Sequence, residues 1–351
     1  MEYPLVSIMI ATYNSDKVLG RTLEAISKQS YPAEKIEILI VDGGSSDATL
    51  DIAREYGCHV LKNDKTEPIN AKMMGLRAAS GKYLITLDHD EVFANMTDIE
   101  IKVMAAMEQK LCKAFLGSGY IRPREYPGIN EYISEFGDPF SLFIYNFPKG
   151  DSFFEKTLRK NYRVTYENDM YMVVSFKDAK ECGIIELCCL GTMIDLEYFK
   201  ELPGMIEDPS IMVHAFYEML KDGIGEIVVC KNSGLLHYSA DSIRAYLPKL
   251  KWRVRNNIHF SSMASSGFEG RTTYQKSARV KKYFFVPYTI STFVPLCHAI
   301  YLAMTRKNIS FLWHPFFCWY VLLNIVWEYV KKILKVQQKL TSYDGKKVID
   351  K

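Results

Sequence analysis

Three carboxylates follow directly after an apolar run in the stretch Leu84-Ile-Thr-Leu-Asp88-His-Asp90-Glu91-Val92. Carboxylates this close repel one another, and a cation normally holds such a group in its ionised form. Oxygen ligands suit the hard ions Mg²⁺ and Mn²⁺, which also bridge to the phosphates of a nucleotide. Asp88 and Asp90 are therefore candidate metal ligands at the end of a buried strand. A solvated turn is the alternative interpretation, because short acidic patterns are common.

The elements that must position these acids follow from the hydrophobic pattern around them. Continuous apolar runs are typical of strands covered on both faces, and amphipathic stretches between them are typical of helices. The expected strands span residues 5–11, 36–41, 58–61 and 83–87, and the expected helices span residues 17–29, 47–56 and 67–79. This alternation predicts an α/β fold with a Rossmann-like, mostly parallel sheet that has helices on both faces.

Polar segments follow three of the expected strands, and ligands of such sheets bind beyond the carboxyl ends of the strands. These segments are Thr12-Tyr13-Asn14, Asp42-Gly-Gly and Asp88-His-Asp90. No G-x-G-x-x-G pattern follows the first strand, and no P-loop pattern occurs anywhere in the sequence. The missing patterns argue against a dinucleotide-dependent dehydrogenase and against a P-loop enzyme.

Four motifs in order resemble those of glycosyltransferase family 2, whose members are inverting enzymes with the GT-A fold. The motifs are Val6-Ser-Ile-Met-Ile-Ala-Thr-Tyr-Asn14, Ile40-Val-Asp-Gly-Gly-Ser-Ser-Asp-Ala-Thr49, Asn70-Ala-Lys-Met-Met-Gly75 and Leu87-Asp-His-Asp90. The resemblance is strong over residues 4–92 and looser to about residue 245. It implies a GT-A catalytic domain over residues 1–245, in a membrane-anchored enzyme of bacterial or archaeal type.

The resemblance also implies which residues contact a nucleotide-sugar donor. They are Thr12, Tyr13, Asp42, Ser45, Lys72 and Asp88. Lys72 stands where the family often has arginine, and a lysine offers the donor's phosphates a point charge rather than a planar fork. A turn-forming role is the alternative for Asp42, and a solvated helix face is the alternative for Lys72.

Further along the chain, Glu207-Asp208 matches an acidic pair that the family commonly places at the start of a helix under the acceptor. By that resemblance Asp208 would be the catalytic base, with Glu207 beside it, before a helix expected over residues 209–220. Acids at a helix start also complement the helix dipole, so capping is the alternative. His237 ends another strand and would help to hold the metal or the diphosphate, unless it is simply structural.

The segment that follows, residues 246–282, is basic and is expected to connect the catalytic domain to the membrane. Processive members of the family carry Q-x-x-R-W here, whereas this sequence reads Pro-Lys-Leu-Lys-Trp252 without the glutamine. That departure argues against polymer synthesis. The basic side chains are expected to face a phosphate or the inner membrane leaflet.

Two apolar stretches, Tyr283–Met304 and Phe311–Tyr329, are each long enough to cross a hydrocarbon core of about 30 Å. They predict a membrane hairpin over residues 283–333, followed by a polar tail over residues 334–351. Basic residues before and after the pair place both outer ends in the cytoplasm. A re-entrant or interfacial pair of helices is the alternative, because His298, His314 and three prolines interrupt the apolar pattern.

Composition excludes other classes of protein. The chain has 351 residues and a net charge of only +3, with no polybasic tract, so nucleic acid is not an expected partner. Its eight cysteines form no C-x-x-C pair, which indicates neither a zinc site nor a disulfide framework. A strand is expected almost from the first residues, and the catalytic domain is therefore expected in the cytoplasm.

The combined expectation is an inverting glycosyltransferase at the cell membrane, with a multi-pass or hairpin anchor. It would move a sugar from a nucleotide-sugar, with UDP favoured over GDP, to a hydroxyl of a lipid-linked or glycan acceptor. Mg²⁺ or Mn²⁺ would be held by Asp88, Asp90 and His237 and would neutralise the leaving diphosphate.

Three alternatives compete with this expectation. A polyprenyl-phosphate sugar synthase of the dolichyl-phosphate mannose synthase type would use an ionised phosphate as nucleophile and has little need of a base at Asp208. A nucleotidyltransferase usually carries a glycine-rich loop that is absent here. A non-catalytic sugar-nucleotide-binding membrane scaffold has no reason to keep like charges together.

Overall fold

The computed structural model describes residues 2–179, 181–183, 185–260, 271 and 275–341. The chain divides into two compact units. The sheet unit comprises Met1–Ile121, Gly150–Lys180 and Ile185–His237, and the helical unit comprises Arg122–Lys149, Glu181–Ile184 and Tyr238–Lys351. This grouping differs from the linear division expected from the sequence, because residues 122–149 group with the C-terminal helices. The further boundaries at residues 246, 283 and 334 stay predictions.

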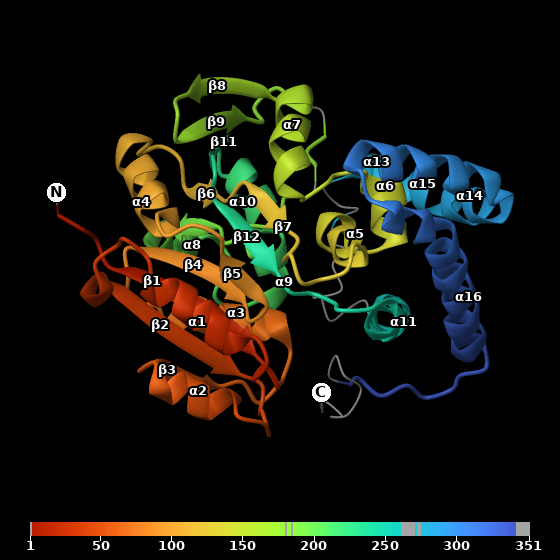
Figure 1. Ribbon diagram of the computed structural model, residues 1–351, viewed down its shortest axis with the longest axis horizontal. Coiled ribbons are helices and arrows are strands. Elements are labelled where there is room, and N and C mark those ends of the chain that lie inside the picture. The colour runs from red at the N-terminus through yellow and green to blue at the C-terminus, as the bar shows by residue number, and fades with distance from the viewer. Residues whose placement is uncertain (1, 180, 184, 261–270, 272–274, 342–351) are drawn as a thin grey trace. The chain divides into compact units, whose positions relative to one another are not determined.

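The sheet unit begins with the four parallel strands that the apolar runs predict. They are β1 (Val6–Thr12), β2 (Ile36–Asp42), β3 (His59–Lys62) and β4 (Tyr83–Asp88). Their order in the sheet is β3-β2-β1-β4, and every pairing among them is parallel (Figure 1). Every residue of β1 is buried, as expected for a strand covered on both faces. The predicted α/β fold is confirmed.

Three helices connect these strands: α1 (Leu19–Ser27), α2 (Thr49–Glu55) and α3 (Pro68–Ala78). The apolar stripe of α1 is buried at Leu19, Leu23 and Ile26. Helix α3 begins at Pro68, whose fixed φ suits the first helical position. The preceding Glu67 caps α3 by accepting a hydrogen bond from the Asn70 amide at 2.8 Å.

Five more strands extend the sheet and make it mixed. They are β10 (Met193–Asp195), β6 (Ala114–Leu116), β11 (Glu226–Cys230), β9 (Tyr171–Ser175) and β8 (Arg163–Glu167), in that order beyond β4. Strand β10 is antiparallel to β4, whereas β11 is parallel to β6. The remaining helical segments of this unit are η1 (Ala33–Lys35), α4 (Asp98–Glu108), α7 (Asp151–Asn161), α8 (Leu196–Glu201), α9 (Pro209–Val213) and α10 (Ala215–Lys221).

A second, three-stranded sheet lies in the same unit, with the order β5 (Glu91–Phe93), β12 (Gly234–His237) and β7 (Gly119–Ile121). The apolar pattern of residues 114–121 predicts one strand, but the structure divides it between the two sheets as β6 and β7. Gly117 lies at this division, where a Cβ would come too close to the backbone oxygens of Leu190 and Ser233. The helix expected over residues 209–220 is likewise divided into α9 and α10.

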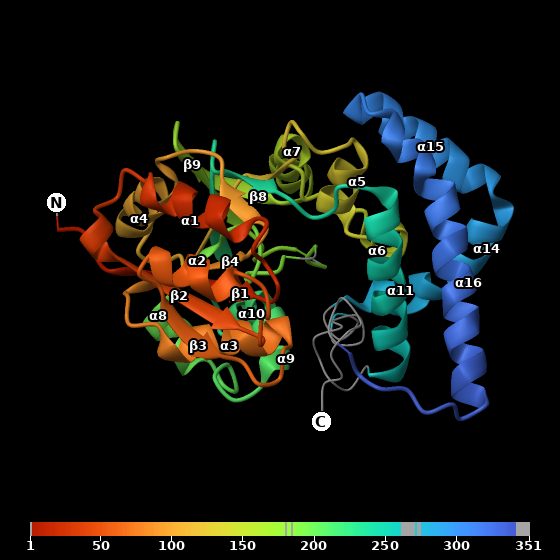
Figure 2. The same cartoon turned by 60° about the horizontal axis from the view of Figure 1, so that its bottom comes forward.

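The helical unit packs helices from distant parts of the chain around one core. They are α5 (Ile129–Phe136), α6 (Pro139–Tyr145), α11 (Ile243–His259), α13 (Lys276–Lys281), η2 (Lys282–Phe284), α14 (Phe285–Ser291), α15 (Phe293–Arg306), η3 (Ile309–Trp313) and α16 (His314–Ile333). Tyr132, Tyr246 and Phe317 are buried in this core, which joins α5, α11 and α16. Figure 2 shows α11 and α16 side by side.

The expected membrane hairpin is only partly present. One helix, Ile309–Ile333, is long and apolar enough to cross a bilayer. The apolar stretch expected to span the membrane over residues 283–304 is not one continuous helix, because the chain is broken at Thr292, where φ is 50°, and the helices on either side are bent by 92°. By length and composition the described chain therefore holds one possible span, or two if the bent pair counts as one.

Two helical glycines provide a test of the packing of α3 on the sheet. A Cβ on Gly75 of α3 would overlap the buried Met9 side chain of β1, whereas a Cβ on Gly20 of α1 would meet nothing within 4 Å. We expect Gly75→Ala to destabilise the protein by about 1–3 kcal/mol through overpacking. Gly20→Ala should stabilise it by about 0.5–1 kcal/mol through helix propensity. Midpoints of urea unfolding would measure both, and equal shifts in the same direction would contradict the packing described.

Candidate active site

Three polar strand exits lie together at one edge of the large sheet. Strand β1 lies between β2 and β4, with Thr12 opposite Asp42 and Ala11 opposite Asp88. The parallel registers thus bring together segments that are up to about seventy-six residues apart in the sequence, from Thr12 to Asp88. This is the edge at which ligands of such sheets bind.

Asp42 forms the turn after β2. Its Oδ2 accepts hydrogen bonds from the backbone amides of Gly44 and Ser45, each at 2.8 Å. Its Oδ1 accepts hydrogen bonds from the hydroxyls of Thr12, at 3.0 Å, and Ser45. Asp42 is only 3% exposed, so these four donors satisfy its carboxylate within the protein. The turn-forming interpretation of Asp42 is therefore confirmed, and a contact between Asp42 and a nucleotide stays a prediction.

The loops after β1 and β2 form one hydrogen-bonded rim around this turn. The Asn14 amide donates to the Ser45 hydroxyl at 2.8 Å, and the Asn14 side-chain oxygen accepts from the Ser46 amide at 2.9 Å. Asn14 adopts a φ of 49°, a conformation that asparagine tolerates better than most residues. Tyr13 lies half-buried on the same loop. The donor-binding residues predicted at Tyr13 and Ser45 thus belong to one braced rim.

Lys72 of α3 is buried and paired with the first acid of the cluster. Its Nζ lies 2.9 Å from Asp88 Oδ1 and donates to the backbone carbonyl of Cys188 at 2.7 Å. Burial by itself would lower the pKa of Lys72, but the nearby Asp88 carboxylate raises it well above its ordinary value. Since Lys72 is only 3% exposed, the alternative of a solvated helix face is wrong. Its contact with a donor phosphate stays a prediction.

Glu91 is a buried member of the cluster that the sequence did not assign. It accepts a hydrogen bond from the Asp88 amide at 3.0 Å and another from the Tyr120 hydroxyl. Burial, and then the charge of Asp88, raise the pKa of Glu91 well above its ordinary value. Glu91 was visible as the third acid of its run. No local sequence pattern pointed to Tyr120 as a partner of Glu91, because its strand β7 is connected to β5, which carries Glu91, only through β12.

Asp90 and His237 come close through the small sheet. His237 is paired with Glu91 across β12 and β5, and its Nε2 lies 3.8 Å from Asp90 Oδ2. The His237 ring stacks on the Tyr120 ring with their centroids 4.4 Å apart. Asp90 and His237 thus lie close to each other, and their role with Asp88 in holding a metal stays a prediction.

The donor set of this neighbourhood fits a divalent cation that also binds substrate. Among the described residues, no three His, Cys, Asp or Glu side chains form a ready-made metal cage. Mg²⁺ usually takes only one or two protein carboxylates and completes its shell with water and substrate phosphates. Octahedral ligand atoms about 2.0–2.1 Å from one ion lie about 2.9 or 4.1 Å apart, so Asp90 Oδ2 and His237 Nε2, 3.8 Å apart, would share an ion after a small shift. The imidazole nitrogen favours Mn²⁺ over Mg²⁺ at such an open site.

Glu207 and Asp208 are exposed residues in the turn that leads into α9. The Asp208 amide donates to the Gly204 carbonyl at 2.9 Å, which holds the turn closed. The Ile206 carbonyl accepts a hydrogen bond from Arg77 of α3, and α9 packs on α3 (Figure 1). The acidic pair is thus attached to the helix that carries Lys72. A catalytic role for either residue stays a prediction.

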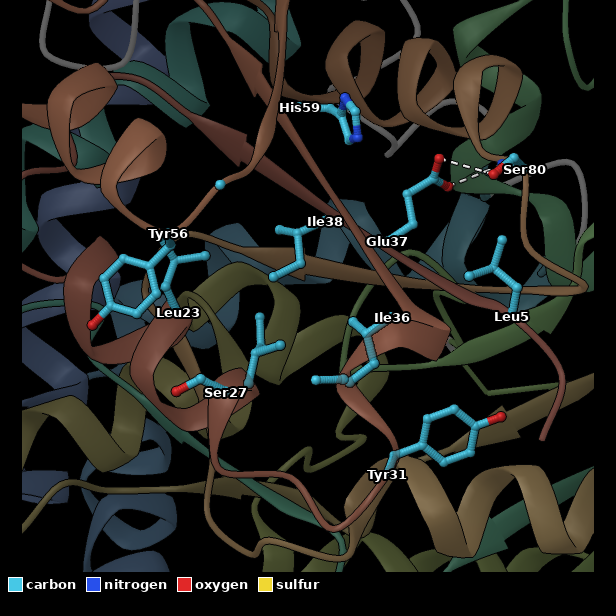
Figure 3. Close-up of a pocket in the computed structure, with 13 residues that line it drawn as sticks. Leu5, Leu23, Ser27, Tyr31, Ile36, Glu37, Ile38, Tyr56, His59 and Ser80 are labelled. Atoms are coloured by element: carbon cyan, nitrogen blue, oxygen red, sulfur yellow. Dashed lines mark hydrogen bonds between the residues drawn. The ribbon is translucent and has the colours of Figure 1, made fainter.

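A separate hollow lies at the opposite, amino ends of the parallel strands (Figure 3). Glu37 of β2 is its main charged group, and the Ser80 amide and hydroxyl donate to that carboxylate at 3.0 and 2.9 Å. Leu5 and Ile36 line the same hollow. Because the catalytic candidates follow the carboxyl ends of β1, β2 and β4, this hollow is not part of the candidate active site.

Comparison with known proteins bears on the fold and the family. The family model described as "Glycosyl transferase family 2" matches residues 7–182. Glycosyltransferase AglE from Haloferax volcanii is 33% identical over 93 residues, which cover 25% of this chain and 31% of that protein. A Methanococcus voltae dolichyl N-acetyl-alpha-D-glucosaminyl phosphate 3-beta-D-2,3-diacetamido-2,3-dideoxy-beta-D-glucuronosyltransferase is 36% identical over 87 residues, 23% of this chain and 27% of that one. The chain thus spans less than a third of either relative.

One solved structure extends the comparison over most of the chain. It is the mannosyltransferase PcManGT from Pyrobaculum calidifontis in complex with GDP-Man and Mn²⁺, with a TM-score of 0.50 and 13% identity. The likeness covers 93% of this chain and 88% of that one. At this identity it shows the fold alone.

The Lys72–Asp88 pair makes a prediction about stability. Lys72→Met would leave Asp88 beside Glu91 without its cation and the Cys188 carbonyl without its donor. We expect a loss of about 1–3 kcal/mol in the free energy of unfolding, below the full cost of breaking a buried pair, because Asp88 is about a third exposed. Urea unfolding would measure it.

The exposed Lys65→Met is the matched control and should change stability by less than about 0.5 kcal/mol. Adding Asp88→Asn to Lys72→Met should recover part of the loss, because the two side chains are coupled. If Lys72→Met proved as harmless as Lys65→Met, the ion pair would not stabilise the site.

Proposed function

Because this chain belongs to glycosyl transferase family 2, we propose that it transfers a sugar from a nucleotide-sugar to a hydroxyl group of an acceptor, with inversion at the sugar carbon. One observation is the main support for this proposal. At the carboxyl edge of the parallel strands, a buried lysine, a pair of aspartates and a histidine converge beside a braced polar rim. Such an edge can receive a diphosphate and its metal together.

The donor would bind with its nucleoside on the rim formed by the loops after β1 and β2. Thr12, Tyr13 and Ser45 would contact the base and ribose, and the Asp42 turn would hold the rim in shape. Lys72 and Asp88 would lie at the diphosphate. A UDP-sugar is the favoured donor and a GDP-sugar the second choice.

Asp90 and His237 would hold a divalent cation, Mg²⁺ or Mn²⁺, with Asp88 beside them. When bound, the cation supplies positive charge against the diphosphate that leaves. The protein's own contribution is to keep the three side chains in place: Tyr120 stacks on His237, and Lys72 pairs with Asp88. The site is thus arranged before the donor arrives, which avoids reorganisation during the reaction.

Asp208 would act as the general base. It would accept the proton of the attacking hydroxyl while that oxygen forms a bond to the anomeric carbon and the bond to the diphosphate breaks. A single displacement inverts the anomeric centre. The exposure of Asp208 supports this role, because an acceptor can reach it from solvent.

The acceptor is proposed to be a lipid-linked sugar or a glycan at the cytoplasmic face of the cell membrane. The support is the helical unit, where large apolar side chains are exposed from Tyr283 to Val336. Exposed apolar surface of that extent marks a site for a membrane or another protein. An acceptor carried on lipid would be presented where such a surface binds.

The metal role is tested by Asp90→Asn, with Asp64→Asn as an exposed control. An amide cannot supply the charge that holds the cation, so transfer should fall by at least about a hundredfold in Asp90→Asn and remain unchanged in the control. Nucleotide release from a panel of UDP- and GDP-sugars, with and without a lipid extract, would measure transfer. Full turnover in excess EDTA would contradict the metal mechanism.

The base is tested by Asp208→Asn, with the exposed Glu201→Gln as the control. A base acts on the nucleophile only, so Asp208→Asn should lower kcat by about a hundredfold or more while donor affinity changes little. Calorimetric binding of UDP and GDP would measure the affinity separately. A collapse of nucleotide affinity along with transfer would place Asp208 in the donor site instead. Normal transfer to a lipid phosphate by Asp208→Asn would favour the polyprenyl-phosphate sugar synthase.

A further inference from the structure

The loop between the two apolar segments is tied to α5. Arg306, at the end of α15, forms a buried ion pair with Glu135, its Nε lying 3.0 Å from Glu135 Oε1. Asn308 donates to the Gly128 carbonyl and to the Glu131 carboxylate, each at 2.8 Å. All of these residues belong to the helical unit. The loop is therefore held by residues that precede both apolar segments by more than 100 positions.

These contacts are incompatible with a hairpin that spans the membrane. In a spanning hairpin, residues 305–310 would emerge on the face of the bilayer opposite to residues 122–149. The hydrocarbon core is about 30 Å thick, so contacts of 2.8–3.0 Å between these two segments could not form across it.

The packing of α11 on α16 also argues against α16 as a membrane-spanning helix. The two helices touch near both ends, where the Tyr246 and Phe317 rings lie 5.2 Å apart and His259 Nε2 lies 3.2 Å from Glu328 Oε2. Helix α11 carries five cations: Arg244, Lys249, Lys251, Arg253 and Arg255. Placing cations at the centre of a bilayer is energetically costly. If α16 crossed the membrane alongside its partner, α11 would bring these charges with it.

The other face of α16 is apolar and exposed. The exposed side chains on it are Phe316, Leu323, Val326, Trp327, Val330 and Ile333. The bent pair, Lys276–Ser291 and Phe293–Arg306, exposes further large apolar side chains, among them Ile290, Phe293 and Tyr301. At about 1.5 Å per residue, these stretches of 16 and 14 residues are each too short to cross the core. These residues form what we call the apolar platform.

Basic residues flank the apolar platform at the breaks in the chain. They are Lys276, Arg279, Lys282, Lys307, Lys332 and Lys335. An apolar surface bordered by cations is complementary to a bilayer that contains anionic lipids, because each basic residue near the surface strengthens the attraction. This charge pattern distinguishes a lipid surface from another protein as the occupant.

We infer that the helical unit binds one leaflet of an anionic membrane through the apolar platform and that none of its described segments crosses the bilayer. The chain is then a monotopic protein, with Lys307 on the same side of the membrane as the sheet unit. The inference concerns topology and holds whichever sugar is transferred.

The first experiment locates Lys307. Single cysteines are introduced as Lys307→Cys and, in the sheet unit, Leu111→Cys, which is 82% exposed. The exposed Cys297 is first changed to serine to lower the background. Both proteins are labelled with a membrane-impermeant maleimide in sealed inside-out membrane vesicles, before and after detergent. We expect both cysteines to have the same accessibility without detergent. If only Leu111→Cys were labelled before detergent, Lys307 would lie on the opposite side of the membrane from the sheet unit. That result would contradict the monotopic topology and support the spanning hairpin.

The second experiment tests the apolar platform. Leu323→Glu combined with Trp327→Glu places two charges on the exposed face of α16, and Leu111→Glu is the matched control on the sheet unit. Binding is measured by flotation with vesicles of phosphatidylcholine, with or without one-third phosphatidylglycerol. We expect the double variant to lose at least about tenfold in binding, the control to be unchanged, and binding to be stronger with phosphatidylglycerol. Unchanged flotation of the double variant would overturn the assignment. Neither experiment reads turnover, so each can fail without affecting the proposed transfer reaction.

Discussion

Repulsion between the carboxylates that follow β4 is the constraint on which the candidate site depends. Asp88, Asp90 and Glu91 lie within four positions of one another, and the fold gives each a different partner. Lys72 neutralises Asp88, and a buried tyrosine donates to Glu91. Asp90 is left near His237, where a cation fits. The second sheet supplies two of these partners. Strand β12 carries the histidine and β7 carries the tyrosine to the end of β4.

The first part of the fold follows from local sequence patterns, whereas the later parts depend on contacts that such patterns do not contain. Continuous apolar runs bounded by polar exits are sufficient for four parallel strands. By contrast, Gly117 ends one strand and allows another to start because two distant backbone oxygens approach it. The break at Thr292 is equally invisible in a hydropathy average, since its flanks remain apolar. Residues 122–149 likewise carry no local pattern that predicts their grouping with the C-terminal helices.

The site was predictable as a set of acids and a histidine, but not as a network. Asp90 and His237 were expected to help hold one metal, and the strand pairing brings these two side chains close together, whereas the metal site itself stays a prediction. Lys72 was expected to face a ligand, and it already has a protein partner. The carboxylate of Asp42 is satisfied within its own turn, which propensity alone would favour. Residue types with strong local signals were therefore found, and long-range hydrogen-bond partners were not.

The contact between Gly128 and Asn308 joins residues 180 positions apart, so it cannot form until most of the chain has been synthesised. A ribosome adds roughly 5–20 residues per second, so the α5 segment waits on the order of ten seconds or more before its partners exist. During that interval the apolar side chains of α5 and α6 have no core to enter, and exposed segments of this kind are prone to aggregation. The pairings among the sheet unit's first four strands join residues at most 77 positions apart, from Val6 to Tyr83, so these strands wait less. Newly made chains should therefore depend on chaperones for the helical half far more than for the sheet.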